Sequence, residues 1–383
     1  MECHKIQIMT FKKFICCFKR WEIYPNRCRH CFDTCFICHS IEKERVPDQR
    51  FKWYDRGALL TIWGGQTLWS YILKRTLSLI PILFIVSLVI FFIIHLTPGD
   101  PVSYMLGDEA TEEQINNVRE EMGLNLPIYE QYFHWIANVL KGDFGVSFHM
   151  NTTVLDAIFS HVAPTLSLAI FAQVIALLIA IPLGIIAAIK RGTIVDQAVM
   201  GLSLLGMAVP SFLLALFLVL LIGVHLQWLP IAGYQPLSSG LWNHLKYLIL
   251  PAISLGSIQA ALIARMTRSS MLEVLNNNYI NMARSKGVSE RKVIYSHALH
   301  NAFLPILTVI GQTFGALVTG AVITETIFNI PGLGQLIINS VERRDYTVIQ
   351  GIVLFVTFIY VMLNLLIDLL YGVVDPRVRL DEK

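Results

Sequence analysis

Six long apolar runs constrain the fold of this chain more than any other feature of its sequence. Each run is rich in Leu, Ile, Val, Phe and Ala and is long enough to cross about 30 Å of hydrocarbon as an α-helix. Charged residues make up only 15% of the 383 residues, whereas about a quarter is usual in globular chains. The sequence therefore predicts an all-α integral membrane protein. The expected spans are residues 76–97, 163–189, 197–224, 247–268, 303–325 and 349–374.

The positions of Lys and Arg predict how these spans are oriented. One set of flanking segments is rich in basic residues, while the opposite set is longer and holds few of them. Under the positive-inside rule the basic set is cytoplasmic, so both ends of the bundle are expected to face the cytoplasm. The basic flanks hold Lys74, Arg75, Lys190, Arg191, Arg265, Arg268, Arg284, Lys286, Arg291, Lys292, Arg377, Arg379 and Lys383.

The segment between the fourth and fifth expected spans, residues 268–302, is polar and basic, which a simple connection between two spans does not require. Gly287 occupies a position at which a helix would end with a left-handed residue. Ser289 would then cap a second helix that begins at Glu290, whose carboxylate favours a helix N-terminus. The pattern predicts a helix, a sharp turn and a second helix on the cytoplasmic face. Such an element suits the transmission of force from a soluble motor to the spans.

This segment resembles the "EAA" loop of ABC importer permeases, in the variant of the dipeptide/oligopeptide/nickel family, whose loop reads close to Y-x-x-x-A-R-x-K-G. Asn281 and Met282 replace the glutamate and the first alanine of the motif name, so the family's roles at these two positions are not transferred to this chain. The resemblance rests here on Tyr279, Ala283, Arg284, Lys286, Gly287, Leu304 and Pro305. It continues over residues 69–380 in LTPGDP (96–101), GDFGVS (142–147), Pro210-Ser211-Phe212, FNIPGLG (328–334), RDY (344–346) and DPRVR (375–379).

The resemblance implies a six-transmembrane bundle of the ABC importer permease type, with a small external helical segment after the first span. The expected organisation is a first transmembrane helix at 68–97, an external cap at 98–162, and a five-helix core at 163–380 that includes the coupling loop 268–302. Function would be the import of dipeptides or oligopeptides by alternating access across the cytoplasmic membrane of a prokaryote. Nickel or glutathione import within the same family is the alternative substrate assignment.

The family also implies partners. These are a second homologous permease, two cytoplasmic ABC ATPases and an external solute-binding protein, with ATP and Mg on the ATPases and no cofactor or nucleic acid on this chain. Arg284 and Lys286 would contact the ATPase, Gly287 would set the turn, and Pro305 would orient the start of the fifth span. The sequence contains no phosphate-cradling G-x-x-x-x-G-K-[ST] loop, so this subunit is expected to be a transporter component and not an enzyme.

The external segment predicts two short helices. Thr111 and Gln114 fit a capping box, Gly123 would end the first helix, and Pro127 suits the first turn of the second. Two roles are open for this cap: it receives the solute-binding protein, or it only shields the bundle.

Prolines and ionisable residues within the spans bear on the pathway. Pro182 and Pro210 are expected to kink the second and third spans. Pro210, Ser211 and Phe212 are candidates to line the substrate pathway, with simple packing as the alternative.

A rival function from another class is a self-sufficient secondary carrier or channel. Asp368, Glu325 and Arg265 are the few ionisable groups in or near the spans, too few for a proton relay. An elaborate cytoplasmic loop also disfavours that rival.

Residues 1–67 form an atypical N-terminal extension that holds all seven cysteines and no apolar run of spanning length. Cys28, Cys31, Cys35 and Cys38 form two C-x-x-C pairs, which can supply four thiolates to zinc. Zinc pairs are usually separated by about fifteen residues, so the short separation here disfavours a metal site. The alternative is that translation begins at Leu68, decoded as methionine, because Gly64-Gly65 can be encoded with the ribosome-binding sequence GGAGG. The nucleotide sequence tests this hypothesis.

Overall fold

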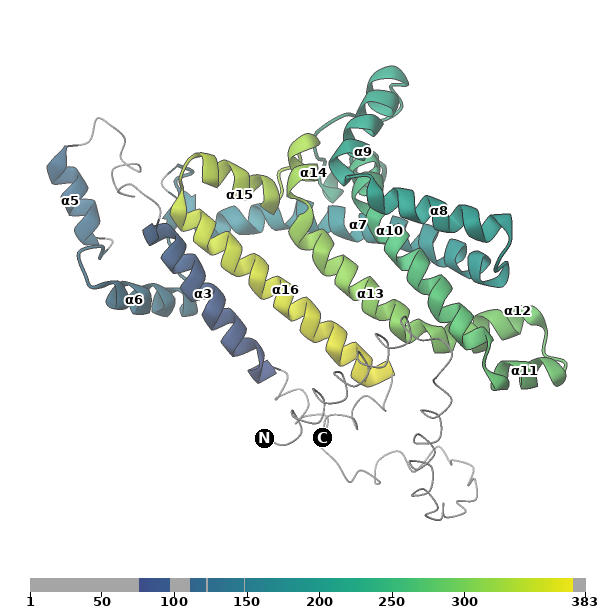
Figure 1. The fold of residues 1–383 in the computed structure, drawn as a ribbon. Coiled ribbons are helices and arrows are strands. Elements are labelled where there is room, and N and C mark those ends of the chain that lie inside the picture. Colours follow the sequence, from purple (N-terminus) through teal and green to yellow (C-terminus); the bar gives the residue numbers. More distant parts are fainter. Residues whose placement is uncertain (1–75, 97–110, 122, 148, 375–383) are drawn as a thin grey trace, which may run out of the picture. The chain divides into compact units, whose positions relative to one another are not determined.

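Long apolar helices make up most of the described part of the protein. The computed structural model describes residues 76–96, 111–121, 123–147 and 149–374. All of these residues belong to one compact unit, Gly65–Lys383. Among these residues, four helices are long and apolar enough to cross a membrane (Figure 1). They are α7 (Val154–Ile189), α10 (Leu241–Leu275), a continuous helix over Glu290–Gly320 and α16 (Tyr346–Val374). The third of these comprises α12 (Glu290–Lys292), the π-helical segment η5 (Val293–Ala298) and α13 (Leu299–Gly320).

The third expected span is broken. It consists of α8 (Ile194–Ala208), α9 (Ser211–Leu218) and the π-helical segment η3 (Val219–His225), and the two halves are bent by 97°. Val209 has an extended ψ of 119°, as a residue before proline prefers because the proline ring disfavours its helical conformation. The prediction of a kink at Pro210 within one helix is therefore wrong, whereas Pro182 lies inside the uninterrupted helix α7.

The first expected span corresponds to α3 (Leu79–Leu96), a shorter apolar helix. With four long helices, one bent pair and α3, the described residues are consistent with six spans, but the count of six stays a prediction. The cysteine cluster, the proposed start at Leu68, and the motifs at residues 97–101 and 375–379 lie outside the described residues.

The segment after α3 contains α5 (Glu112–Glu121), α6 (Ile128–Leu140) and a two-stranded antiparallel sheet, β1 (Val146–Ser147) with β2 (Thr152–Thr153), which the sequence did not predict. The capping box is confirmed, because Thr111 N donates to Gln114 Oε1 at 3.0 Å and Gln114 N to Thr111 Oγ1 at 3.4 Å. Gly123 has a φ of +66° just after α5, and Pro127 is the N-cap of α6 and not its first helical residue.

Helix α6 packs along the side of α3. The Tyr132 hydroxyl is 2.8 Å from Ser87 Oγ, in the middle of α3, and the Tyr132 ring meets Phe91 edge-on at 5.4 Å between centroids. The cap was also expected to extend to residue 162, but α7 begins at Val154. Thr153 caps it by accepting from Asp156 N at 3.1 Å, so the helix begins before residue 163, where the five-helix core was expected to start; the boundary of the cap stays a prediction.

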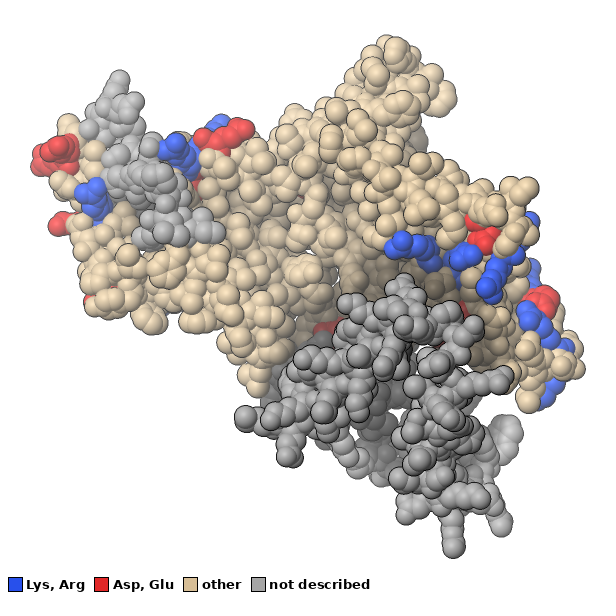
Figure 2. Space-filling view, in the orientation of Figure 1, with Lys and Arg blue, Asp and Glu red and all other residues tan. Residues whose placement is uncertain are grey.

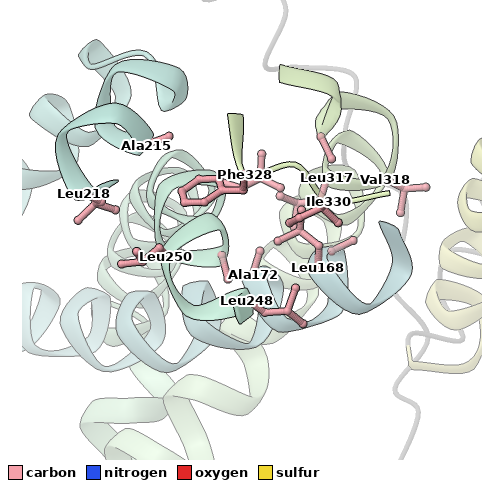
Figure 3. Packing of buried hydrophobic residues seen from close by; sticks show 14 residues of the cluster. Leu168, Ala172, Ala215, Leu218, Leu248, Leu250, Leu317, Val318, Phe328 and Ile330 are labelled. Atoms are coloured by element: carbon pink, nitrogen blue, oxygen red, sulfur yellow. The ribbon is translucent and has the colours of Figure 1, made fainter. Parts of the chain in front are cut away.

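Small residues bring the central helices together. Helix α10 packs against α7, α8, α9 and α13, and a Cβ on Gly184 would lie only 2.6 Å from Thr267 Cβ. Close packing of this kind is a main source of helix association in lipid. An apolar cluster is formed by buried residues of α7, α9, α10, α13 and the segment after α13 (Figure 3). Its labelled members are Leu168, Ala172, Ala215, Leu218, Leu248, Leu250, Leu317, Val318, Phe328 and Ile330.

Two short helices that the sequence did not predict follow α13. They are α14 (Val322–Ile327) and α15 (Leu333–Glu342), and the FNIPGLG motif joins them. The connection between η3 and α10 contains a single 3-10 turn, η4 (Leu237–Ser239).

Candidate functional site

The elbow, defined here as residues 276–298 between α10 and α13, consists of α11 (Asn278–Ser285), a turn, α12 and η5. Lys286 is the C-cap of α11, and Gly287 follows with a φ of +77°. Nothing lies within 4 Å of a Cβ built on Gly287, so backbone conformation and not space favours glycine there. Val288 N donates to Ala283 O at 3.2 Å, which closes the helix end. The predicted helix, turn and second helix are confirmed.

Ser289 occupies the predicted N-cap of the second helix but makes no side-chain capping bond there. The ion pair between Arg284 and Glu290 instead spans the turn, with Arg284 Nε 2.7 Å from Glu290 Oε1 and Nη2 3.4 Å from Oε2. An exposed pair contributes about 0–1 kcal/mol, so it adds little to the stability of the fold. Arg284, predicted to contact an ATPase, thus also has a partner within its own loop.

Buried apolar side chains fix the elbow to the spanning helices. Ile280 on α11 and Val293 on η5 are fully buried, and they pack with Met271 of α10, Ile185 of α7 and Ile306 of α13 in one cluster. Burying a side chain of this size contributes about 1.5–3 kcal/mol. These contacts place residues of the elbow in one apolar cluster with residues of α7, α10 and α13.

The opposite face of the elbow is exposed, basic and partly apolar. Figure 2 shows Lys and Arg gathered around α11 and α12, in contrast to the largely uncharged middle of the molecule. Met282 and Tyr295 are exposed beside Lys286, Arg291 and Lys292, a combination suited to a protein partner with acidic and apolar groups.

The remaining predicted loop residues lie nearby. Tyr279 is partly exposed on α11, and burial raises the pKa of its phenol while a hydrogen bond with Asn301 acts in the opposite direction. Pro305 lies inside the continuous helix α13, within its first turns.

Sequence reasoning missed a second ion pair, which joins Asp196 and Arg268. Arg268 donates from Nε to Asp196 Oδ1 at 2.5 Å and from Nη2 to Oδ2 at 2.8 Å. Asp196 also accepts from Gly192 N at 3.0 Å, so it joins the start of α8 both to the preceding turn and to α10. The preference of helix N-termini for acidic residues was the available signal for Asp196; its partner was recognisable only in three dimensions.

At the other end of α13, Glu325 is the centre of a buried network that we call the outer latch, formed with Thr165 and residues 333–335. Its carboxylate accepts from Thr165 Oγ1 at 2.6 Å, Gly334 N at 2.8 Å and Gln335 N at 3.1 Å, and Leu333 N donates to Thr165 Oγ1 at 2.8 Å. Glu325 is 0% exposed, and burial raises its pKa although these donors act in the opposite direction.

The outer latch explains the glycines of the FNIPGLG motif. A Cβ on Gly332 would lie 2.4 Å from the Glu325 carboxyl group, and one on Gly334 would lie 2.5 Å from Val322 Cα. Glycine is needed here for space, since the carboxylate reaches the N-terminus of α15 only if no side chain intervenes. The sequence motif alone did not indicate its pairing with Glu325.

Two further motifs meet nearby, although they are far apart in the chain. Ser147 of GDFGVS donates to Asp345 of RDY at 2.6 Å, and Asp345 also accepts from Val348 N at 3.3 Å, in the first turn of α16. Both side chains are buried. The contact anchors the sheet β1–β2 to α16.

The candidate pathway residues lie at the bend in the third span. Pro210 is the N-cap of α9, and Ser211 and Phe212 are its first two residues. Pro210 and Phe212 are exposed. A separate groove lies between α10 and α13, and its lining residues come from those two helices alone. Pro210, Ser211 and Phe212 are therefore not part of that groove.

Comparisons with known proteins found two matching families and similar solved structures. Residues 180–380 match the family described as binding-protein-dependent transport system inner membrane component, and residues 68–169 match the family for the N-terminal part of that membrane component. Among solved structures, the inward-facing MetNI methionine ABC transporter matches at a TM-score of 0.48 and 18% identity, covering 58% of this chain and 97% of that chain.

Curated relatives are similar over most of the chain. The probable peptide ABC transporter permease y4tP of Sinorhizobium fredii (strain NBRC 101917 / NGR234) is 40% identical over 309 residues, which are 81% of this chain and 99% of the relative. The glutathione transport system permease GsiC of Escherichia coli (strain K12) is 41% identical over 310 residues, again 81% and 99%. This chain therefore belongs to the family of inner-membrane permease components of binding-protein-dependent ABC transport systems.

Proposed function

We propose that this multi-pass membrane permease imports peptides, and that ATP hydrolysis on separate subunits drives it through the cytoplasmic elbow. The observation that carries the proposal is the structure of the elbow itself. It has an exposed basic face on α11 and α12, a backbone turn that requires Gly287, and a buried apolar face fixed to three spanning helices.

The partners in this proposal are two cytoplasmic ABC ATPases, a second permease of similar fold and an external solute-binding protein. ATP binding closes the ATPase pair, α11 moves with it, and the buried contacts of Ile280 and Val293 pass the displacement to α7, α10 and α13. Lys286 and the neighbouring basic residues contact the ATPase, and both ends of the bundle face the cytoplasm. ATP and Mg reside on the ATPases.

Peptide is the proposed substrate class, and glutathione import is the second candidate. The family includes a probable peptide permease and a glutathione permease at similar identity. Glutathione is itself a small peptide with free carboxylates, so both candidates share one chemistry: a short backbone with charged ends.

Reconstitution in proteoliposomes tests the proposal. The complete complex should accumulate a labelled tripeptide only with ATP and binding protein. Gly287→Val should abolish uptake while insertion is retained, because a β-branched residue disfavours a left-handed backbone by about 1–2 kcal/mol. Gly142→Val is the matched control, since Gly142 also has a positive φ (+88°) and open space but lies after α6, outside the elbow.

Two results would contradict the proposal. Normal uptake by Gly287→Val would remove the coupling role of the elbow. ATP-independent uptake by liposomes containing only this polypeptide would favour the self-sufficient carrier.

A further inference from the structure

A groove of about 500 Å³ lies between the spanning helices α10 and α13. Its lining residues recur at helical spacing on both helices, so two stripes face each other across it. They are Gln259, Leu262, Arg265, Met266 and Ser269 on α10, and Val309, Gln312, Thr313 and Ala316 on α13.

Several groove residues are polar although both helices cross the membrane. Gln312 is exposed in the groove, Gln259 is 9% exposed, and Thr313 donates to Gln173 Oε1 at 3.4 Å behind it. The amide Nε2 of Gln173 has no hydrogen-bond partner among the described residues. Carboxamides facing lipid are costly, so this face borders water or another polar surface.

The charge of the groove has one sign. Its lining contains Arg265 and no Asp or Glu. Arg265 is exposed, with no carboxylate of the described residues within ion-pair distance. By contrast, Arg268 pairs with Asp196 and Arg284 pairs with Glu290. Arg265 is thus an unneutralised cation near the cytoplasmic end of a polar groove.

We propose that this groove is a transient binding site for the transported peptide, in which Arg265 pairs with the substrate carboxylate while Gln259 and Gln312 hydrogen-bond its backbone amides. A guanidinium matches a carboxylate with two parallel hydrogen bonds, and a carboxamide can donate to a peptide carbonyl and accept from a peptide N–H. This inference rests on the proposed peptide import and adds to it the substrate contacts within the membrane. Glutathione presents the same carboxylate chemistry.

Thiol accessibility tests whether the groove contains water and binds the substrate. All seven cysteines of the chain lie in residues 1–67, so their replacement by serine leaves a background in which Ala316→Cys is unique. In the complete complex a charged, membrane-impermeant thiol reagent should label Ala316→Cys, and a free-acid tripeptide with binding protein and ATP should slow the labelling. Leu178→Cys is the control, because Leu178 is 70% exposed on the apolar helix α7 and lines none of this groove.

The role of Arg265 is tested by comparing a tripeptide free acid with its C-terminal amide. Arg265→Gln should abolish the protection of Ala316→Cys by the free acid and reduce its initial uptake at least about tenfold, the effect expected for loss of a charge-assisted pair. Arg265→Lys should retain part of both. Arg191→Gln removes an exposed Arg outside the groove and should leave both unchanged.

The outcomes separate this inference from the proposed function. Absence of labelling at Ala316→Cys in every state would mean that the second permease or lipid fills the groove, and would overturn the inference while peptide uptake continued. Equal protection by the free acid and the amide, or undiminished uptake by Arg265→Gln, would overturn the role of the carboxylate. Absence of ATP-dependent peptide uptake by the unmodified complex would instead overturn the proposed function.

Discussion

Replacement of Glu325 by alanine is expected to loosen the outer latch, which joins α7, α14 and α15. The substitution removes the acceptor for Gly334 N and Gln335 N and the partner of the Thr165 hydroxyl. It leaves a buried backbone donor at Gly334, since no other acceptor is bonded to it in the described network. The change is therefore a loss of hydrogen-bond satisfaction more than a loss of apolar packing.

The magnitude follows from these bonds. A buried donor left without an acceptor costs about 1–3 kcal/mol, and Gln335 N is only partly buried, so water can satisfy it at lower cost. With the cavity left by the side chain, Glu325→Ala should lower the free energy of unfolding by about 3–5 kcal/mol. Glu325→Gln keeps one acceptor oxygen and should cost about 1–2 kcal/mol.

Denaturant unfolding of the purified permease in detergent measures these differences, with Glu273→Ala as the control because Glu273 is an exposed acid on α10. A cycle with Thr165→Val isolates the coupling across the 2.6 Å bond. The reasoning is refuted if Glu325→Ala unfolds at the same denaturant concentration as the unmodified protein, or if alanine and glutamine cost the same.

The pH dependence provides an independent check on Glu325. Since burial raises its pKa, the folded protein binds this proton more tightly than the unfolded chain. Its contribution to stability is therefore present below the unfolded pKa of about 4.3 and is lost as the pH rises through the folded pKa. Glu325→Gln should remove that fall from the pH profile, and an unchanged profile would contradict the assigned burial.

Two further predictions concern the contacts of α10. Gly184→Ala should lower the free energy of unfolding by about 1–3 kcal/mol, because its Cβ would meet Thr267 at 2.6 Å; Gly201→Ala, with open space around it, should be neutral or stabilising in the same denaturation series. Asp196→Asn should lower the free energy of unfolding by about 1.5–3 kcal/mol by breaking the charge-assisted bonds from Arg268. A protease-protection assay of the turn between α7 and α8 should then show faster cleavage. Equal unfolding of the two glycine variants, or unchanged cleavage, would contradict these assignments.

Local features of the protein were predictable from the sequence, because they depend on residues a few positions apart. The capping box at Thr111 and Gln114 is an example, and so is the turn at Gly287. Apolar runs likewise predicted the membrane helices, since each must bury its backbone polar groups within itself. The break at Pro210 was predicted only as a kink, because a proline inside a membrane helix can also leave the helix continuous, as Pro182 does in α7.

Contacts between distant segments were decided only by the tertiary structure. Nothing within a few residues of Glu325 indicates Thr165 as its partner, and Ser147 lies far along the chain from Asp345. The groove of Gln259 and Gln312 likewise exists only where α10 and α13 meet. The sequence by itself determined a membrane protein with several spans and a helix-turn-helix elbow between two of them, since hydrophobicity and turn chemistry act locally. Which polar groups meet was decided by helix packing, because burial gives each polar side chain only the partners that neighbouring helices supply.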